Sequence, residues 1–538
     1  MLLTKLKKSS SYVVNTLRSF WCEILVFLLF VLMRLPALGY DTFNTDVWKW
    51  KQRIYDFGTG VFTANFEMTI QKYHPGVTLM WIGAAAVKFF NAFYKITTGG
   101  LPADNNIGVI FELNFLQKLF IVLVLGFVVA MIFSMLKKLF GLRYAVIAVA
   151  LFSLEPFYVA LSREIHLEAL MATFMVASFV YLFAYLKESS RRLLYISGIF
   201  AALAVLTKSS ALFLLPFTGL LFLVEKRKIG LALKDYWPWL GTAILTFVLL
   251  WPAMWVAPLE ALKTLGSGIF NTGIEEGHIQ LYFGRLVQDP GSFFYPVVLW
   301  LKTSLYIVVG VIAFPFIKKR IGADGKKFAL YLLLFASLYL IEMTIPAKKL
   351  DRYALPAIMA LVLVAAFFFD YLAGKVKFGL ILILLPAIAT TIYLHPNYFS
   401  YYSPLSGGLE KGMFIVGPKW IFGQRELTSA LSKIKQEDNL TGFEGSSLKK
   451  LYYKEELKQK LVVSFPVQYF SQLYPFVYTL DGWPTIDSLR EDARQSNYFV
   501  YPVWDQESDA FTNYNLVYRA TVYMRGVPIY NIYDRVDK

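Results

Sequence analysis

The stretch ELNFLQKLFIVLVLGFVVAMIFSML, residues 112–136, decides the class of this fold. It holds only two charged residues, and it is long enough for a helix that crosses the ~30 Å hydrocarbon core of a bilayer. Ten further apolar segments accompany it, at 20–39, 143–160, 167–186, 193–207, 210–224, 237–255, 294–317, 328–345, 354–370 and 378–394. The sequence therefore predicts an α-helical polytopic membrane protein with about eleven transmembrane helices.

The composition agrees with a membrane protein. Apolar residues make up 57% of the 538 residues and charged residues only 17%, whereas soluble domains carry about 25% charge. The net charge of +16 would suggest nucleic acid for a soluble protein, but most of it lies in short loops, so we expect no nucleic-acid partner. The first apolar segment lacks a signal-peptide cleavage site and is expected to be a retained helix. The single cysteine, Cys22, excludes an internal disulfide.

Basic clusters predict the orientation in the membrane. They fall at every second connection between apolar segments: Lys5/Lys7/Lys8, Lys137/Lys138/Arg143, Lys187/Arg191/Arg192, Lys226/Arg227/Lys228, Lys318/Lys319/Arg320 and Lys375/Lys377. Because short cytoplasmic loops carry an excess of Lys and Arg, we expect a multi-pass protein of the plasma (cytoplasmic) membrane with a cytoplasmic N-terminus. The connections 41–111, 256–293 and 346–353, and everything after 395, are then extracytoplasmic.

One segment, 76–94, bears on this topology because it is apolar enough to be another crossing. A crossing there would move every later basic cluster to the outside. Lys88 and Asn91 interrupt its apolar residues, and His74-Pro75-Gly76 precedes it. We therefore expect an amphipathic helix that lies in the outer interface, within the first outer loop.

The tail differs in composition from the rest of the chain. Charged, amphipathic stretches alternate with strand-like runs at 461–465, 498–501, 515–525 and 527–533. The predicted organisation is a transmembrane domain over 1–395 and a small extracytoplasmic α/β or α+β domain over 396–538, which is large enough for its own core.

Several functional classes lack their motifs. There is no phosphate-binding Gly-rich fingerprint, no Cys/His zinc spacing and no Gly-x-Ser-x-Gly elbow. An ATP-driven pump or a typical hydrolase is therefore not expected, and we predict no cofactor and no divalent metal.

Asp46 is the first candidate for chemistry. It lies in the first outer loop, in Asn44-Thr45-Asp46-Val47-Trp48, where a carboxylate could accept a proton as a general base. It also precedes an amphipathic stretch, and Asp is a favoured helix N-cap. The local sequence by itself favours the cap.

The sequence Arg163-Glu164-Ile165-His166-Leu167-Glu168 places four ionisable groups where a helix enters the bilayer. Arg163 could meet a phosphate while Glu168 holds a substrate or tunes a base. A self-paired Arg–Glu cluster at the interface explains the same residues equally well.

Basic residues also occur at outer helix ends, where the positive-inside rule disfavours them: Lys208, Lys302, Lys348, Lys349 and Arg352. They are candidates for binding a phosphate, and snorkelling to outer headgroups is the alternative. Distant in sequence, they could converge only through folding, and at a cost unless an anion offsets them. The outer loop 271–292 adds Glu275-Glu276-Gly277-His278, but neighbouring glutamates point in different directions and do not favour a metal site.

These residues resemble the GT-C class of membrane glycosyltransferases, and most closely the group of protein O-mannosyltransferases and lipid A aminoarabinose transferases. The resemblance is ordered and runs from about 40 to 425: Asp46; Tyr73-His74-Pro75-Gly76; Ser162-Arg163 with Glu168; Leu206-Thr207-Lys208; Glu276-Gly277-His278; Phe294-Tyr295-Pro296 with Lys302-Thr303; Lys349-Leu350-Asp351-Arg352-Tyr353; and 401–408. The chain departs from the family at Gly76, often Pro; at Val47, often Glu; and at Glu168, often Asp. No sugar-binding insertion of the MIR type is seen in 256–293.

The resemblance implies roles for these residues. Asp46 matches the catalytic base and Glu168 the second acid. Lys208 and Arg352 match cations near the carrier phosphate, and Arg163 and Lys302 are further candidates for that role. The remaining substrate-loop candidates are His74, His278, Glu276 and Tyr353.

The predicted function is an inverting glycosyltransferase that moves a hexose or pentose from a polyprenyl-phosphate donor to a protein hydroxyl, lipid or cell-surface glycan on the outer face. Its expected partners are membrane lipids, the lipid-linked donor and the acceptor, and the chain is expected to be a monomer. An oligosaccharyl transferase or a glycan polymerase of the same class is the alternative. A transporter is less favoured, because no inverted repeat is seen.

Overall fold

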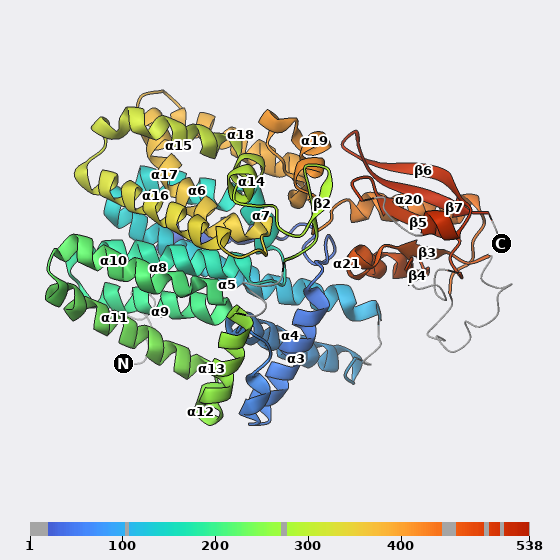
Figure 1. Ribbon diagram of the computed structural model, residues 1–538, viewed down its shortest axis with the longest axis horizontal. Helices are drawn as coiled ribbons and strands as arrows, with labels where there is room; N and C mark the ends of the chain where they lie inside the picture. The colour runs from blue at the N-terminus through green and yellow to red at the C-terminus, as the bar shows by residue number, and fades with distance from the viewer. Residues whose placement is uncertain are drawn as a thin grey trace, which may run out of the picture.

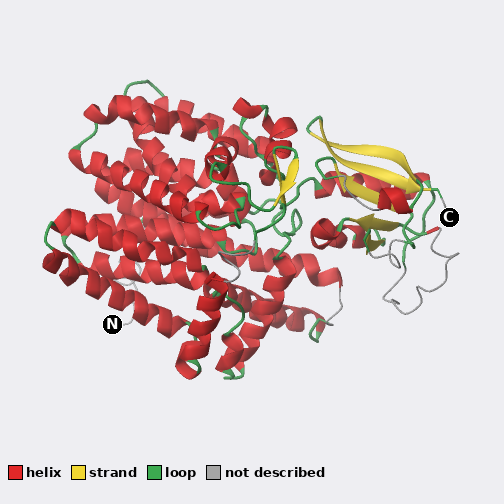
Figure 2. Ribbon diagram, in the orientation of Figure 1, coloured by secondary structure: helices red, strands yellow, loops and turns green. Residues whose placement is uncertain are grey.

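The computed structural model describes residues 20–102, 107–270, 277–443, 459–488, 494–505 and 510–536. A bundle of long helices fills most of the molecule, and a small sheet with its own helices lies at one end of the bundle (Figure 1). The separation of the all-helical part from the sheet is plain when helices and strands are coloured separately (Figure 2).

The helices of the bundle follow the predicted apolar segments. They are α2 (Trp21–Leu32), α3 (Val47–Phe62), α4 (Val77–Thr98), α5 (Ile110–Phe140), α6 (Leu142–Leu154), α7 (Pro156–Ser162), α8 (Glu168–Glu188), α9 (Arg191–Thr207), α10 (Leu214–Lys226), α11 (Ile229–Leu250), α12 (Ala253–Val256), α13 (Pro258–Ser267), α14 (Phe294–Lys302), α15 (Leu305–Ile317), α16 (Ala323–Thr344), α17 (Leu355–Ala373) and α18 (Gly379–Leu394). Short 3₁₀ turns join some of them: η1 (Phe66–Thr69), η2 (Ile107–Val109), η3 (Ser209–Phe213), η5 (Lys318–Arg320) and η6 (Asp351–Ala354). A two-stranded hairpin, β1 (Gln280–Tyr282) and β2 (Arg285–Val287), precedes α14.

The chain is a multi-pass membrane protein. Within the described residues, 6 helices are long and apolar enough to cross a bilayer, or up to 8 if each of two bent pairs counts as one span. The bent pairs are α6 with α7, at 64°, and α14 with α15, at 111°. Fewer segments qualify by this measure than the roughly eleven predicted, because several of the apolar segments form helices of fewer than 18 residues. The helices α2 and α18, for example, are apolar but have only 12 and 16 residues.

The helix predicted to lie in the outer interface is α4, which packs against α3 and α5. It is longer than predicted, with 22 residues, and its length and hydropathy match those of a crossing helix. The interfacial position therefore stays a prediction. Its start is fixed by Gly76, whose φ of +61° suits glycine and whose missing Cβ leaves room for the ring of Trp50.

Two basic connections lie far from the sheet. The α10–α11 connection, with Lys226, Arg227 and Lys228, and the α15–α16 connection, with η5, are both at the end of the bundle opposite the sheet (Figure 1). These two clusters, which the positive-inside rule places in the cytoplasm, thus lie at one end of the bundle (Figure 1), whereas Lys5, Lys7 and Lys8 lie outside the described residues.

The C-terminal region is a small α/β domain, as predicted. Its elements are η7 (Tyr398–Ser400), η8 (Pro404–Ser406), α19 (Gly408–Ile415), α20 (Gln424–Glu437), β3 (Val462–Phe465), α21 (Val467–Tyr478), β4 (Trp483–Ile486), β5 (Tyr498–Pro502), α23 (Ala510–Asn513), β6 (Leu516–Met524) and β7 (Val527–Arg535). The sheet order is β4-β3-β5-β7-β6, with β3 parallel to β4 and β5 and the last three strands antiparallel. The helix α21 is the crossover that parallel strands require. Arg525 and Gly526, both with positive φ, form the tight turn of the β6–β7 hairpin.

Candidate functional site

A cavity of about 910 Å³ lies where the bundle meets the C-terminal domain. Its walls come from the first outer loop, the starts of α3 and α8, the end of α9, the β1–β2 hairpin, η6, the segment before α20, and the C-terminal domain. Seven basic residues line it, namely Lys49, Arg53, Lys72, Lys208, Lys348, Arg352 and Lys419, against three acidic ones, Asp46, Glu168 and Asp505. This excess of positive charge favours an anionic ligand.

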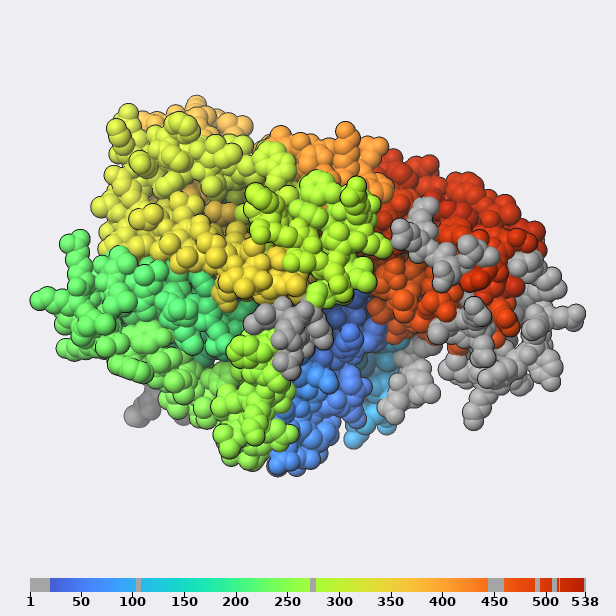
Figure 3. All heavy atoms as spheres, in the orientation of Figure 1, coloured from blue at the N-terminus to red at the C-terminus, as the bar shows by residue number. Residues whose placement is uncertain are grey.

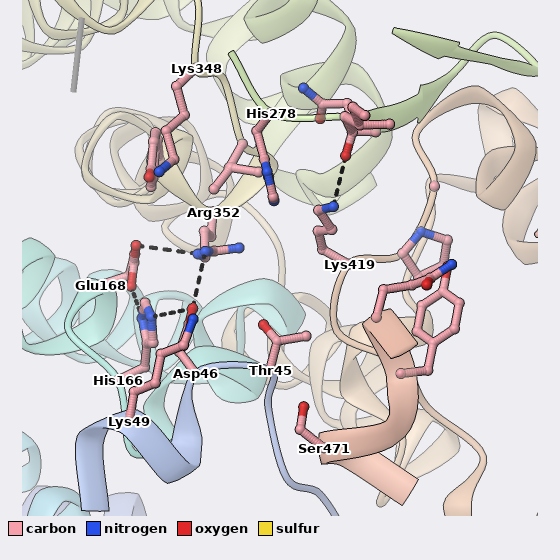
Figure 4. Close-up of a pocket in the computed structure, with 18 of the residues that line it drawn as sticks. Thr45, Asp46, Lys49, His166, Glu168, His278, Lys348, Arg352, Lys419 and Ser471 are labelled. Atoms are coloured by element: carbon pink, nitrogen blue, oxygen red, sulfur yellow. Dashed lines mark hydrogen bonds and ion pairs between the residues drawn. The ribbon is translucent and has the colours of Figure 1, made fainter. Parts of the chain in front are cut away.

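A histidine between two carboxylates forms the centre of the cavity (Figure 4). The Nε2 of His166 lies 3.5 Å from Asp46 Oδ2, and its Nδ1 hydrogen-bonds to Glu168. Trp50 and Trp420 hold the imidazole edge-on from two sides, with ring centroids 6.4 and 4.7 Å away. The chain turns sharply between α7 and α8, and this turn aims His166 into the cavity.

The two carboxylates differ in their access to a substrate. The side chain of Asp46 is 29% exposed, whereas that of Glu168 is 1% exposed. Of the two carboxylates, Asp46 is therefore the one open to a ligand in the cavity, whereas Glu168 is covered by His166 and the neighbouring cations.

Asp46 does not act as a helix cap. It occupies the N-cap position of α3, but its side chain makes no capping hydrogen bond. Instead, its carboxylate faces His166 and lies 3.6 Å from the guanidinium of Arg352. Burial by itself raises the pKa of Asp46, but the hydrogen bond and charge of His166, together with Arg352 and Lys49, outweigh burial and lower the pKa. The carboxylate is thus kept ionised and able to accept a proton.

His166 is the residue of this site to which the sequence analysis gave no role. Burial lowers its pKa, but the charge of Glu168 and the hydrogen bonds to both carboxylates outweigh burial and raise the pKa above the ordinary value of a histidine. The signal in the sequence was the density of ionisable groups at the start of α8. It did not tell which of them face the cavity.

Lys208 and Arg352 converge as predicted, and the anion that offsets their charges is the carboxylate of Glu168. The ammonium of Lys208 lies 2.9 Å from Glu168 Oε1 and above the ring of Tyr353. Arg352 reaches the same oxygen at 3.4 Å through Nε, but outside hydrogen-bond geometry, so this buried Nε has no hydrogen-bond partner among the described residues. Arg352 thus retains an unused donor beside the cavity.

The substrate-loop candidates partly line the same cavity. His74, His278 and Tyr353 do so, and His74 Nδ1 lies 3.3 Å from the hydroxyl of Ser209. Burial and the charge of Lys208 lower the pKa of His74 well below its ordinary value. Burial and nearby cations lower the pKa of His278 to about 4, so both imidazoles are neutral near pH 7. Glu276 lies outside the described residues.

Two predicted phosphate ligands are not in this cavity. The guanidinium of Arg163 is 1% exposed and is bound by Asp41, at 2.6 Å, and by the carbonyls of Arg34 and Pro36. The ammonium of Lys302 lies 3.3 Å from the carbonyl of Tyr401 and over the ring of Tyr402, buried behind the cavity. Neither group lines the cavity, so this geometry gives no support to the phosphate role, which stays a prediction for both.

Arg163 instead belongs to a buried network that fixes the first loop. Lys118 of α5 donates to the carbonyl of Thr42 at 2.8 Å and lies 3.5 and 3.3 Å from Asp41 and Glu164. The two cations and two carboxylates are mutually paired. Arg163 and Glu164 are thus buried structural groups, but they pair with Asp41 and Lys118 and not with each other as the self-paired alternative expected. Glu168 instead lines the cavity.

Metal ligands do not gather here in the described part of the chain: no group of three His, Cys, Asp or Glu residues could hold an ion. Both ring nitrogens of His166 already face carboxylates. Independence of a metal stays a prediction.

Comparison with known proteins supports the resemblance drawn from the motifs. A family model described as dolichyl-phosphate-mannose-protein mannosyltransferase matches residues 109–255. This stretch contains His166, Glu168 and Lys208. The resemblance to the membrane glycosyltransferases is thus confirmed over this part of the chain. Curated protein sequences give no match.

Three solved structures are similar at low identity. ArnT from Cupriavidus metallidurans bound to undecaprenyl phosphate has a TM-score of 0.49 and 12% identity, over 95% of this chain and 97% of that one. The apo oligosaccharyltransferase of Archaeoglobus fulgidus has a TM-score of 0.42 and 13% identity, over 92% and 73%. AglB from Archaeoglobus fulgidus in complex with an inhibitory peptide and a dolichol-phosphate has a TM-score of 0.41 and 13% identity, over 93% and 73%.

Proposed function

We propose that this chain is an inverting glycosyltransferase that moves a monosaccharide from a polyprenyl-phosphate donor to a hydroxyl acceptor at the outer face of the membrane. One observation carries the proposal: a partly exposed carboxylate, Asp46, lies 3.6 Å from an arginine with an unused buried donor, in a basic cavity at the end of a membrane bundle. The description of the matching family model, which names a lipid-phosphate-linked sugar, supports this donor class.

The donor phosphate fits the positive side of the cavity. Arg352 and Lys208 come from different connections and meet above Glu168. A phosphate that hydrogen-bonds to Arg352 can be held by the planar guanidinium, which matches phosphate oxygens with two donors. The prenyl chain can remain in the bilayer, because the cavity lies at the outer ends of the membrane helices.

The reaction is a single displacement. The acceptor oxygen attacks the anomeric carbon and its proton passes to Asp46. The bond between that carbon and the phosphate oxygen breaks, and the lipid phosphate leaves with the bonding electrons. Arg352 and Lys208 stabilise the charge that develops on it. Attack opposite the leaving group inverts the anomeric configuration.

Donor binding also activates the base. Arg352 is one of the charges that lower the pKa of Asp46. A bound phosphate competes for Arg352 and adds negative charge nearby, and both effects raise the pKa of Asp46. The carboxylate then becomes a stronger base when the donor is in place.

The orientation follows from charge. The basic α10–α11 and α15–α16 connections lie opposite the cavity (Figure 1), so a cytoplasmic position for them places the cavity and the C-terminal domain outside. The membrane is the plasma membrane in this proposal, and the chain functions as a monomer without a metal.

The test uses the purified full-length protein in nanodiscs. We expect undecaprenyl phosphate to bind with saturable affinity, and a radiolabelled undecaprenyl-phosphate hexose to lose its label to a membrane extract or, slowly, to water. A protein that binds no polyprenyl phosphate, or that transfers label only from a pyrophosphate-linked oligosaccharide, would overturn the proposal. The second result would favour oligosaccharyl transfer.

A further inference from the structure

The C-terminal domain forms one wall of the reaction cavity. In the space-filling view its atoms abut those of the bundle without an intervening gap on the visible face (Figure 3). Three of its segments line the cavity: residues 417–419 before α20, the start of α21, with Val467, Gln468, Tyr469 and Ser471, and the turn after β5, with Trp504 and Asp505. The predicted tail domain is therefore part of the site.

This wall is fixed relative to Asp46. The indole of Trp48, two residues after Asp46, donates to the carbonyl of Ser471 at 2.8 Å and packs on Tyr474 with ring centroids 5.1 Å apart. Phe43, from the same loop, packs on Phe476. One helix of the C-terminal domain thus holds the loop that carries the proposed base.

Gln472 of α21 holds a second segment of the cavity wall, residues 419–421, through hydrogen bonds to its backbone. Its amide accepts from the backbone N–H of Ile421 at 3.0 Å and donates to the carbonyl of Lys419 at 3.1 Å. The segment it holds includes Trp420, which contacts His166 and Arg352. Lys419 lies between Arg352 and the helix that carries Ser471 (Figure 4).

The wall presents polar groups that suit hydroxyls. Asp505 Oδ2 accepts from the Tyr469 hydroxyl and from the Gln468 amide, each at 2.8 Å, and Trp504 Nε1 donates to the Tyr469 hydroxyl at 3.3 Å. Gln468 is exposed and Asp505 is partly exposed. A carboxylate has about four acceptor sites, so Asp505 can take further hydrogen bonds from a ligand.

The two ends of the cavity therefore differ in chemistry. Lys208 and Arg352 offer cations where a leaving phosphate can bind, while Asp505 and Gln468 offer an acceptor and an amide on the side of the C-terminal domain. In a displacement that inverts, nucleophile and leaving group lie on opposite sides of the anomeric carbon. The acceptor consequently faces the C-terminal wall.

We propose that the C-terminal domain is the acceptor-binding half of the enzyme, and that Asp505 and Gln468 bind hydroxyl groups of a saccharide acceptor. The inference rests on the proposed glycosyl transfer. A saccharide fits better than a peptide, because peptides are commonly bound along a sheet edge or in an apolar groove. Among the described residues, no strand of the C-terminal sheet lines the cavity, and the lining groups there are mostly polar.

The experiment measures two ligands on the full-length protein in nanodiscs. Saturation-transfer NMR reports binding of N,N′-diacetylchitobiose, maltose and a threonine-containing hexapeptide, while a separate titration gives the affinity for undecaprenyl phosphate. We expect at least one disaccharide to bind. Asp505→Asn should weaken disaccharide binding about tenfold, as loss of a hydrogen bond to a charged group does. The affinity for undecaprenyl phosphate should change by less than about twofold.

Two further variants make the test specific. Gln468→Ala changes an exposed side chain and should leave the fold intact. It should therefore weaken disaccharide binding in a folded protein even if Asp505→Asn folds poorly. Asp481→Asn removes the same charge from the same domain at an exposed position outside the cavity, where it pairs with Lys435, and should change neither affinity.

Several results would overturn the inference. Binding of the peptide but of neither disaccharide would make the acceptor a protein. A loss of undecaprenyl phosphate affinity in Asp505→Asn equal to the loss for the disaccharide would assign the wall to the donor. If the wild-type protein binds a disaccharide but no polyprenyl phosphate, the donor proposal fails while the saccharide site stands.

Discussion

Replacing Asp46 with asparagine separates its proposed role as a base from a role as a helix cap. Asparagine is as good a cap as aspartate, and the Asp46 side chain makes no capping hydrogen bond, so α3 should keep its start. The substitution removes only the charge that faces His166 and Arg352 at 3.5 and 3.6 Å.

The expected effects on rate and on stability differ in size. Loss of a general base lowers turnover by about a hundredfold or more, which corresponds to about 2.7 kcal/mol or more on the barrier. Loss of the charged contacts with His166, Arg352 and Lys49 at a partly exposed site should lower the free energy of unfolding by about 1–3 kcal/mol. Donor affinity should be unchanged or higher, because Arg352 no longer has Asp46 as a partner.

The assay compares transfer of labelled sugar, undecaprenyl phosphate affinity and melting temperature in wild type, Asp46→Asn and Asp56→Asn. Asp56 lies on the same helix, outside the cavity, and accepts from Gln52 at 2.9 Å. We expect the control to match wild type in all three measurements. Near-normal turnover of Asp46→Asn, with intact donor binding, would refute the assignment of Asp46 as the base.

Three further predictions follow from the same geometry. Arg352→Lys should weaken undecaprenyl phosphate binding about tenfold and keep only part of the affinity that Arg352→Ala loses, because an ammonium cannot make the two-pronged contact. Equal affinity of wild type and Arg352→Lys would exclude that contact. The raised pKa of His166 adds stability that is fully present below the pKa of an unfolded histidine, about 6.5, and that is lost as pH rises through the higher folded pKa. The melting temperature should therefore fall over that pH range, and His166→Asn should make the fall less steep. An equally steep fall in the variant would contradict this prediction. Single cysteines at the exposed positions Thr63 and Lys433 should react with an impermeant maleimide in intact cells, while one at Lys228 should not; protection of Lys433 would invert the proposed orientation.

The sequence by itself determined the class of the molecule. Runs of about 20 apolar residues can be stable only across a bilayer or in a very large core, so the membrane assignment needed no tertiary information. Four of the five described strands of the C-terminal domain were equally predictable, because period-two patterns and the Arg525-Gly526 turn are local signals, whereas β4 (Trp483–Ile486) was not predicted. Asp46, Glu168, Lys208 and Arg352 were also identified from sequence, through their motifs and their unusual place at outer helix ends.

Tertiary structure decided which of these charges meet. Arg163 and His166 are three residues apart, yet the turn between α7 and α8 sends the first to Asp41 in a buried network and the second to Asp46 in the cavity. No local pattern encodes that choice, because an ion pair depends on which loops the packing brings together. Helix lengths were likewise not set by hydropathy alone, since the apolar segments at 20–39 and 378–394 form helices of only 12 and 16 residues.

The place of the C-terminal domain in the site was also invisible to the sequence. Its composition marked it as a separate unit, but Ser471 and Trp48, which join it to the first loop, are more than four hundred positions apart. Contacts over such a separation arise only when helix packing has fixed both segments in space. The sequence thus identified most of the residues of the site, and the tertiary structure determined the distances between them.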